Sequence, residues 1–345
     1  MQAPCLESPH LPDISLNEKN SAEERQYLRR LLTQPLPEIP PIYFYDDRGS
    51  ELFEQITTLP VYYQTRTEIS LLEKYAPQMI EAAAPHRLIE LGSGAGRKIR
   101  LLLEACRAAG MGKSCTMLDI NQRFLEESIE RLREDFRGIA FDGILGDFCR
   151  DLDKIGPPGG RLIVFFGGTI GNLYPGERKT FFERLAAGMS DSDVLLLGVD
   201  LIKDKAVVEA AYNDSAGITA DFNKNALRVL NTHFGADFHI DSFAHKAFFD
   251  IENAWIEMRL VAQRPMNVRI SALDLVLKLE ADAEIRTEIS CKFSRESLEA
   301  SAGQAGLRIS HWFSDPSALF ALAMIRKPQG ALQQNSQLKR GENGR

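Results

Sequence analysis

The sequence predicts an α/β fold in which a Rossmann-like, seven-stranded domain carries a second, inserted α+β domain. The first observation is the stretch Arg87–Arg100, where a short apolar run breaks into glycines and then into a helical pattern. Strand, glycine turn and helix form the usual opening of a nucleotide-binding α/β domain. The second is a series of further buried strand patterns that alternate with helical ones. The third is a change after Lys205 to helices and alternating strands over about 85 residues, too many for one connection in a compact domain.

Composition and charge place the chain among globular proteins. It has 345 residues, of which 44% are hydrophobic and 26% charged, enough for one large or two ordinary domains. A net charge of −7 offers no basic surface for nucleic acid, and no apolar run reaches the length of a membrane span. The N-terminal residues lack the basic start and long apolar core of a secretory signal. We therefore expect a cytoplasmic protein with neither nucleic acid nor membrane as a partner. We further expect it to be monomeric or weakly associating.

Cysteine and histidine usage predicts neither disulfides nor a metal. The five cysteines are an odd number without a Cys-x-x-Cys pair, which indicates reduced thiols in the cytosol. The six histidines show no metal-ligand spacing. We expect no metal cofactor.

The glycine turn identifies the kind of nucleotide ligand. A dinucleotide fingerprint needs a glycine at its sixth position, which counted from Gly92 is Arg97. Here an acidic residue, Glu90, is followed by glycines at 92, 94 and 96, a pattern that resembles motif I of class I methyltransferases, which use S-adenosylmethionine. That ligand has no pyrophosphate, so a glycine turn that passes its amino acid moiety and ribose suits it. An ordinary glycine loop is the alternative.

Two acidic strand ends favour this ligand. Asp119 ends the expected strand Cys115–Ile120, where a ribose diol is usually held. Asp147 and Phe148 follow a third strand at Ile139–Leu145, where class I methyltransferases place a carboxylate by the adenine amino group and an apolar side chain on the base. Either aspartate alone could be a helix cap or a solvated carboxylate, but both at these spacings indicate S-adenosylmethionine.

The fourth expected strand, Arg161–Phe166, leads to the turn Gly167–Asn172. This strand end faces the transferred methyl in such a fold, so the Asn172 amide would lie beside the substrate. A tight turn with Asn172 in left-handed backbone is the alternative. The other strands of this sheet are expected at Asp193–Asp200, Leu307–Phe313 and Phe320–Arg326, the last of them antiparallel.

Helices and a group of tyrosines precede the glycine turn. Ala22–Leu32 has apolar residues at helical spacing, and a turn at Asp47–Arg48–Gly49 leads into a helix from Ser50. The tyrosines are Tyr43, Tyr45, Tyr62 and Tyr63. Packing of their rings against the core is the plain expectation, and a lid with phenols facing a ligand is the alternative. The expected division is a disordered arm at 1–20, a methyltransferase domain at 68–205 and 293–327, a substrate-binding domain at 21–67 and 206–292, and a disordered tail at 328–345.

From Ile42 to Arg326 the chain resembles the L-histidine Nα-methyltransferases of ergothioneine biosynthesis. The strings that carry the likeness are YFYDDRGSELFEQIT, LPVYYQTRTE, IELGSGAGRK, GDF, FFGGTIGNL, GVDLIKD, AAYNDSAGITADFNKNAL, IEMRL and IRTEISCKF. Several of them are long and lie outside the general methyltransferase motifs. The resemblance implies a class I methyltransferase domain and S-adenosylmethionine-dependent trimethylation of the histidine α-amine to hercynine, the first step of ergothioneine biosynthesis.

The resemblance also implies site residues. S-adenosylmethionine would contact Gly92, Gly94, Lys98, Asp119, Asp147 and Phe148, with Tyr45 nearby. Histidine would lie between the domains, with Tyr62, Asn172 and Tyr212 at its amino acid backbone, Gly167 in the same wall, and Glu288, Ser290 and Met258 at the imidazole. The catalytic candidates are Tyr45, Asn172 and Tyr212. The Lys or Thr variants that are frequent in the family's glycine turn are replaced here by Ala95–Gly96–Arg97, which leaves Lys98 in place.

The imidazole pocket also makes chemical sense from the residues. Alternation along an extended segment puts Glu288 and Ser290 on one face; the carboxylate can accept from one ring N–H while the hydroxyl pairs with the other nitrogen. The alternative is that Glu288 is a surface residue or a salt-bridged one, with Arg286 two residues before it. Three rival functions are a methyltransferase for another amino acid such as a tryptophan derivative, a non-catalytic S-adenosylmethionine-binding protein, and a nicotinamide oxidoreductase, which the glycine spacing disfavours.

Overall fold

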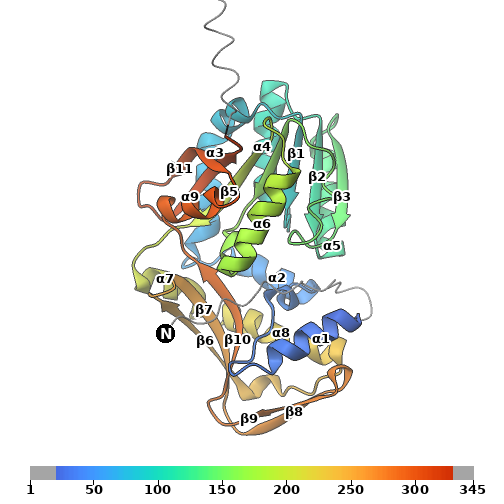
Figure 1. Cartoon of the computed structure of the whole chain (residues 1–345), viewed down its shortest axis with the longest axis vertical. Helices are drawn as coiled ribbons and strands as arrows, with labels where there is room; N and C mark the ends of the chain where they lie inside the picture. Colours follow the sequence, from blue (N-terminus) through green and yellow to red (C-terminus); the bar gives the residue numbers. More distant parts are fainter. Residues whose placement is uncertain (1–20, 329–345) are drawn as a thin grey trace, which may run out of the picture.

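The structure is a computed structural model that describes residues 21–328. The predicted arm at residues 1–20 and the predicted tail beyond residue 328 lie outside these residues. Two bodies follow one another along the long axis, an α/β body and a smaller body built around antiparallel strands (Figure 1). One strand, β10 (Glu284–Cys291), runs from the smaller body to the α/β body.

A seven-stranded sheet forms the centre of the α/β body, in the order β11-β12-β5-β4-β1-β2-β3. All neighbouring pairs are parallel except those that β12 makes with β5 and β11. The strands are β1 (Arg87–Leu91), β2 (Ser114–Asp119), β3 (Ala140–Leu145), β4 (Arg161–Phe165), β5 (Val194–Asp200), β11 (Arg308–Ser314) and β12 (Phe320–Arg326). This sheet confirms the predicted fold class. The order reverses between β1 and β4, which leaves a crevice at their carboxyl ends where such sheets bind ligands.

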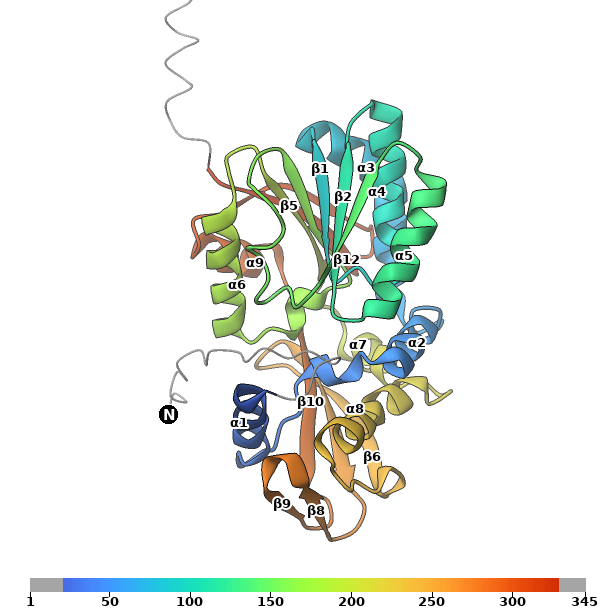
Figure 2. The same ribbon diagram turned by 90° about the vertical axis from the view of Figure 1, so that its right-hand side faces the viewer.

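Helices cover both faces of this sheet (Figure 2). On one face lie α3 (Tyr63–Ala83), α4 (Arg97–Ala109) and α5 (Gln122–Asp135); on the other lie α6 (Pro175–Gly188) and α9 (Arg295–Gly303). Because alternate side chains of a strand face opposite sides, Leu88 and Ile89 belong to different core clusters. Every residue of β4 is buried, which explains its continuous apolar sequence.

The smaller body has a core of its own. Its sheet has the order β10-β7-β6, with β6 (Phe243–Asp250) and β7 (Trp255–Ala262), and a hairpin pairs β8 (Met266–Ile270) with β9 (Leu275–Leu279). Its helices are α1 (Ala22–Leu32), α2 (Asp47–Ile56), α7 (Lys205–Tyr212) and α8 (Ile218–Phe234), with the 3-10 turn η1 (Pro41–Phe44). The buried core joins residues between Leu28 and Tyr63 to residues between Val208 and Ile285. This separate core supports the proposed two-domain division, whose boundaries stay a prediction.

Helix α2 begins earlier than predicted. It starts at Asp47 because the Asp46 side chain accepts a hydrogen bond from the Gly49 N–H at 2.8 Å, the standard N-cap interaction. Gly49 therefore does not form a turn before the helix, and its smallness serves packing. A Cβ added there would lie 1.5 Å from the Phe44 carbonyl oxygen, so the sequence Asp47–Arg48–Gly49 is the first turn of the helix.

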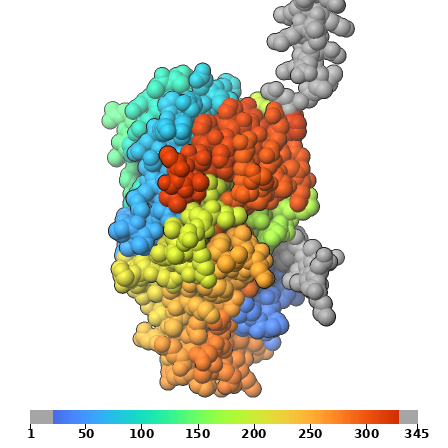
Figure 3. Space-filling model, turned by 90° about the vertical axis from the view of Figure 1, so that its left-hand side faces the viewer, coloured from blue at the N-terminus to red at the C-terminus, as the bar shows by residue number. Residues whose placement is uncertain are grey.

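The junction between the two bodies is hydrogen-bonded. The Phe293 N–H donates to the Asp200 carbonyl at 2.8 Å and the Ile202 N–H to the Phe293 carbonyl at 3.0 Å. The chain leaving β10 thus lies beside the end of β5. In the space-filling view the yellow-green residues near 210 fill the space between the two bodies on this face (Figure 3).

Candidate active site

Two adjoining cavities lie where the two bodies meet. The larger, of about 1000 Å³, opens along the carboxyl ends of β1, β2 and β4, and its size is at the upper end for small-ligand pockets. The smaller lies between α7, β7 and β10. The residues that line both are Tyr45, Phe53, Gly167, Thr169 and Asn172. Molecules bound in the two cavities would therefore meet at this shared wall.

The structure brings all the predicted site residues to these cavities. The larger is lined by Tyr45, Gly92, Gly94, Lys98, Asp119, Asp147, Phe148, Gly167 and Asn172. The smaller is lined by Tyr45, Tyr62, Gly167, Asn172, Tyr212, Met258, Glu288 and Ser290. Their individual roles stay predictions.

The glycine turn leaves room for a ligand. Gly92 and Gly94 have φ values of +67° and +47°, which favour glycine. A Cβ on Gly94 would meet nothing within 4 Å, so this side of the turn faces open cavity. Gly96 differs, because a Cβ there would lie 3.3 Å from Leu132 of α5. The first two glycines therefore allow close approach of a ligand, and the third allows packing between helices.

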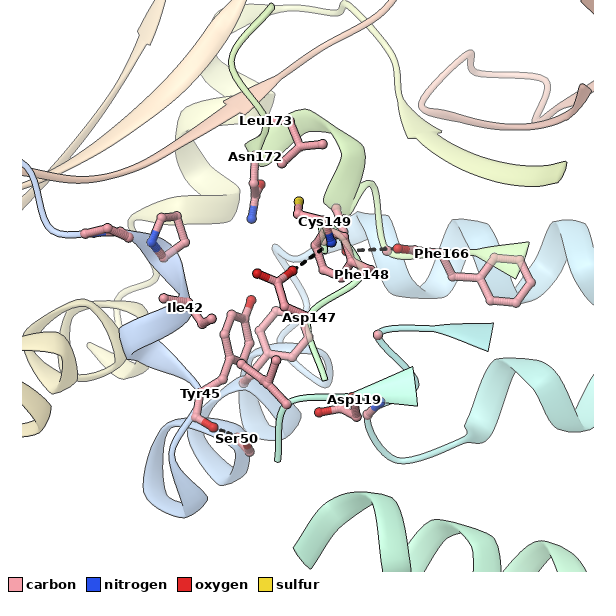
Figure 4. Close-up of a pocket in the computed structure, with 18 of the residues that line it drawn as sticks. Ile42, Tyr45, Ser50, Asp119, Asp147, Phe148, Cys149, Phe166, Asn172 and Leu173 are labelled. Atoms are coloured by element: carbon pink, nitrogen blue, oxygen red, sulfur yellow. Dashed lines mark hydrogen bonds between the residues drawn. The ribbon is translucent and has the colours of Figure 1, made fainter. Parts of the chain in front are cut away.

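Two carboxylates and a ring are placed around the larger cavity. Asp119 accepts hydrogen bonds from the Gly94 N–H at 2.7 Å and the Asn121 N–H at 2.9 Å, and burial raises its pKa despite these bonds. Asp147 accepts from the Cys149 N–H at 2.8 Å and points into the space that the Tyr45 ring also enters (Figure 4). The Phe148 ring lies along the same wall. An adenosine moiety needs these groups: an acceptor for its hydroxyls, an acceptor for its amino group and an apolar face.

A buried carboxylate that sequence analysis missed links the larger cavity to the shared wall. Glu68 of α3 is fully buried, accepts hydrogen bonds from the Gly167 N–H at 2.9 and 3.0 Å, and lies 2.6 Å from the Lys98 ammonium. A Cβ on Gly198 of β5 would lie 2.0 Å from the Glu68 carboxylate. The glycine in that apolar strand therefore provides the space that Glu68 needs.

The imidazole candidates line one side of the smaller cavity. Glu288 and Ser290 come from β10, and Met258 lies opposite Glu288 in the β10–β7 register. Burial raises the pKa of Glu288 to about 7, while Lys292 opposes that rise. Arg286 pairs instead with Glu257 at 3.2 Å and with Glu38 at 3.7 Å. Glu288 itself is buried, so the alternative of a surface residue, or of one salt-bridged to Arg286, is wrong.

Asn172 and Tyr45 face the shared wall. The turn after β4 has left-handed backbone at Gly167 and Gly168, with φ values of +79° and +67°, whereas Asn172 is not among the non-glycine residues with positive φ. The left-handed alternative for Asn172 is therefore wrong, and its side chain projects into the cavity (Figure 4). Burial raises the pKa of Tyr45 further above its usual value of 10, so this phenol stays protonated at neutral pH.

The tyrosine group divides between the two expected roles. Tyr43 is fully buried in the core, where its hydroxyl donates to Glu24 at 3.0 Å. Tyr45 and Tyr62 line the cavities. Tyr63 donates to the Asp200 carboxylate at 2.9 Å. Core packing is thus confirmed for the first, while two others face the space proposed for ligands.

Lys292 is a second residue that sequence analysis missed. Its side chain is fully buried, and its ammonium contacts Asp200 at 2.9 Å, Ser290 at 3.0 Å and Tyr212 at 3.1 Å. A signal was present, because the alternation that pairs Glu288 with Ser290 also places Lys292 on the same face.

Among residues 21–328, no helix is both long and apolar enough to cross a membrane. Within the same residues, no group of three or more His, Cys, Asp or Glu side chains is arranged to hold a metal ion.

The chain is similar to known proteins over a range that includes the residues lining both cavities. The model of a family described as histidine-specific, SAM-dependent methyltransferases matches residues 24–327. A histidine N-alpha-methyltransferase of Mycolicibacterium smegmatis is 43% identical over 300 residues, which cover 87% of this chain and 94% of that protein. A protein of the same name from Mycobacterium tuberculosis is 41% identical over 84% of this chain and 90% of its own length. The ergothioneine biosynthesis protein 1 of Neurospora crassa is 31% identical over 84% of this chain and 33% of its own length.

Proposed function

The chain belongs to the family of histidine-specific, S-adenosylmethionine-dependent methyltransferases, and from this premise we propose that it trimethylates the α-amine of L-histidine to hercynine in ergothioneine biosynthesis. One observation carries the proposal. A cavity with the groups that adenosine needs meets, at Tyr45, Gly167 and Asn172, a second cavity that contains a carboxylate and a hydroxyl suited to imidazole. The reacting nitrogen and the methyl group would meet at that wall.

S-adenosylmethionine is the methyl donor, and when bound it supplies an electrophilic methyl group on a sulfonium sulfur. In our proposal Asp119 accepts from the ribose hydroxyls and Asp147 from the adenine amino group. Phe148 would pack against the base. Lys98 lines the cavity and would attract the donor's carboxylate, and the open side of Gly94 would allow the donor to approach closely.

Histidine would occupy the smaller cavity with its imidazole at β10. Glu288 would accept from one ring N–H, and Ser290 would pair with the other ring nitrogen. An indole has a single N–H and would leave one of these buried groups unpaired, which costs binding free energy. Histidine therefore suits this cavity better than a tryptophan derivative does. Tyr62 and Tyr212 would hold the amino acid backbone, with Asn172 beside the α-amine.

Each transfer is an in-line displacement by the neutral α-amine. The N–C bond forms as the C–S bond breaks, and the first two products must each lose a proton before the next attack. Because the Tyr45 phenol stays protonated, it orients the amine by hydrogen bonding and does not serve as a base, and the proton leaves to solvent. Alignment of the reactants supplies most of the rate enhancement in this proposal. The aromatic residues Tyr45, Phe53, Tyr62 and Phe222 line the smaller cavity. Their rings would stabilise the positive charge that develops on the α-nitrogen as it is methylated.

The test is incubation of the purified protein with deuterated-methyl S-adenosylmethionine and L-histidine, followed by mass spectrometry over time. The proposal expects successive addition of one, two and three labelled methyl groups to the α-nitrogen. Labelling of the ring nitrogens, or no labelling at all while S-adenosylmethionine still binds, would contradict it. The second outcome would favour the non-catalytic binding alternative.

A further inference from the structure

Lys292 contacts two residues that line the smaller cavity, Tyr212 and Ser290, and its own charge is fully enclosed by protein. Its side chain is 0% exposed, and its three partners are the Asp200 carboxylate, the Tyr212 hydroxyl and the Ser290 hydroxyl, at 2.9, 3.1 and 3.0 Å. An ammonium has three N–H donors and no acceptor, so each donor has one partner. Burial opposes the charge, but Asp200 and Tyr212 raise the pKa of Lys292 above its usual value. The group is therefore a cation at all working pH values.

Charged groups surround both lysines of this cluster. Asp200 is the carboxylate partner of two ammonium groups, Lys292 and Lys203, and it also accepts hydrogen bonds from Tyr63 and Gln64. Two further carboxylates act on these cations, Glu288 on Lys292 and Asp315 on Lys203. The contacts that distinguish Lys292 from Lys203 are therefore those to the Tyr212 and Ser290 hydroxyls, and not the net charge of the cluster.

The contacts of Lys292 also decide how two hydroxyls act. Tyr212 and Ser290 both line the smaller cavity, and both accept a hydrogen bond from the same ammonium. A hydroxyl that accepts in this way keeps its own hydrogen for another partner. Tyr212 and Ser290 also interact with each other, so a ligand that accepts from both hydroxyls would replace that contact. Because a hydroxyl polarised by a cation is a stronger donor, the contact with Lys292 favours donation to such a ligand.

We propose that Lys292 is a positioning and specificity-determining residue, which through Tyr212 makes the smaller cavity selective for an amino acid with a free, ionised carboxylate. Through Ser290 it presents a donor to an unprotonated ring nitrogen. The inference rests on the proposed function, because it gives Lys292 a role in the cavity that is proposed to bind histidine. Lys292 contacts the substrate only through these two hydroxyls.

A purely structural role is the competing explanation, since Lys292 also joins β10 to the Asp200 end of β5. Lys203 provides the matched control. It pairs with the same carboxylate and donates to Tyr63 at 2.8 Å, but it is not among the residues that line the smaller cavity. Replacing either lysine removes a buried cation from Asp200, and only one replacement removes the contact to Tyr212.

The experiment compares L-histidine with L-histidinamide, which lacks the carboxylate charge. Calorimetry on the protein bound to S-adenosylhomocysteine measures both dissociation constants for wild type, Lys292→Met and Lys203→Met. The preference for histidine over histidinamide should fall about tenfold or more in Lys292→Met, the size expected for a charge-assisted contact. In Lys203→Met the preference should stay within about threefold of wild type, because the route through Tyr212 is intact.

Each outcome decides between the roles. An unchanged preference in Lys292→Met, or an equal loss in both lysine variants, would overturn the inference. If Lys292→Met loses S-adenosylhomocysteine binding, the double variant Asp200→Asn/Lys292→Met, which removes both charges, is measured in its place. Loss of that binding in the double variant too would assign Lys292 a structural role. Failure of the wild-type protein to bind or methylate histidine would instead overturn the proposed function, and with it the inference.

Discussion

The fully buried carboxylate of Glu68 lies 2.6 Å from the ammonium of Lys98. The same carboxylate accepts a hydrogen bond from the Gly167 N–H. One side chain of α3 therefore positions both Lys98, in the helix after the glycine turn, and Gly167, at the start of the turn after β4. These two segments border the cavity proposed for S-adenosylmethionine and the wall proposed for methyl transfer. In this account Glu68 therefore couples the binding of S-adenosylmethionine to the position of the wall at which the methyl group is transferred.

Glu68→Gln tests this link. The change keeps the volume but removes the charge opposite Lys98, so we expect the free energy of unfolding to fall by about 1–3 kcal/mol. The dissociation constant for S-adenosylhomocysteine should rise about tenfold, because Lys98 loses its fixed position. Denaturant unfolding and calorimetry measure the two effects. The control is Asp135→Asn, which breaks the exposed pair with Arg100 of α4 and should cost less than about 1 kcal/mol. Equal effects of both variants would contradict the account.

Asp119→Asn tests the proposed ribose contact. The Asp119 carboxylate accepts hydrogen bonds from two backbone N–H groups, and the amide of the variant would offer them a single acceptor oxygen. The ribose hydroxyls would also lose a charged acceptor. We expect the affinity for S-adenosylhomocysteine to fall about 10- to 100-fold, as measured by calorimetry. Asp142→Asn on the neighbouring strand β3 is the control, because this side chain is exposed, and it should leave the affinity unchanged. An unaltered affinity in Asp119→Asn would remove the ribose assignment.

The binding of histidine should depend on the ionisation of Glu288. Burial raises its pKa to about 7, and the carboxyl can accept from an imidazole N–H only when it is ionised. We therefore expect the dissociation constant for histidine to rise as pH falls through about 7. Calorimetry between pH 5.5 and 8.5 measures this dependence. In Glu288→Gln only the titration of histidine itself should remain; an identical profile in the two proteins would show that Glu288 does not recognise the ring.

The same raised pKa predicts that Glu288 destabilises the free protein at alkaline pH. Its pKa is about 7 in the folded protein against a usual 4.5, so the folded state binds the proton more tightly. The free energy of unfolding therefore falls as pH rises from about 4.5 through 7. Glu288→Gln should stabilise the protein by about 1–3 kcal/mol at pH 8 and by much less at pH 5. Denaturant unfolding at both pH values provides the measurement.

Glu284, on the same strand, is the control with the opposite sign. Burial works against its charge, but hydrogen bonds from Lys246 and Arg259 lower its pKa. Glu284→Gln should therefore reduce the free energy of unfolding at pH 8. If both variants changed stability in the same direction at pH 8, burial would not be the cause of the Glu288 effect.

The sequence allowed the α/β sheet and its ligand side to be predicted because their signals are local. The glycine turn and Asp147 follow strands, Asp119 ends one, and the strand order then brings them together. Helix α2 was placed too late because Gly49 was interpreted as a turn, although its lack of a side chain serves contact with Phe44. Such a contact between the helix and a preceding turn leaves no pattern in the sequence.

Glu68 and Lys292 show where sequence reasoning ends. Glu68 lies in an ordinary amphipathic helix, and its partners Lys98 and Gly167 follow 30 and 99 residues later in the chain, so no local pattern identifies it. Lys292 could have been found by extending the alternation from Glu288 and Ser290. Its partner Asp200 is known only once β10 is seen to return beside β5.

Competition among amino acids tests the central claim most directly. The purified protein is incubated with S-adenosylmethionine and an equimolar mixture of the twenty amino acids, and mass spectrometry follows every methylated product. The account predicts that histidine alone gains three methyl groups, all on its α-nitrogen, and that Glu288→Ala reduces this selectivity. Methylation of another amino acid in preference to histidine would contradict the assignment of the smaller cavity to imidazole.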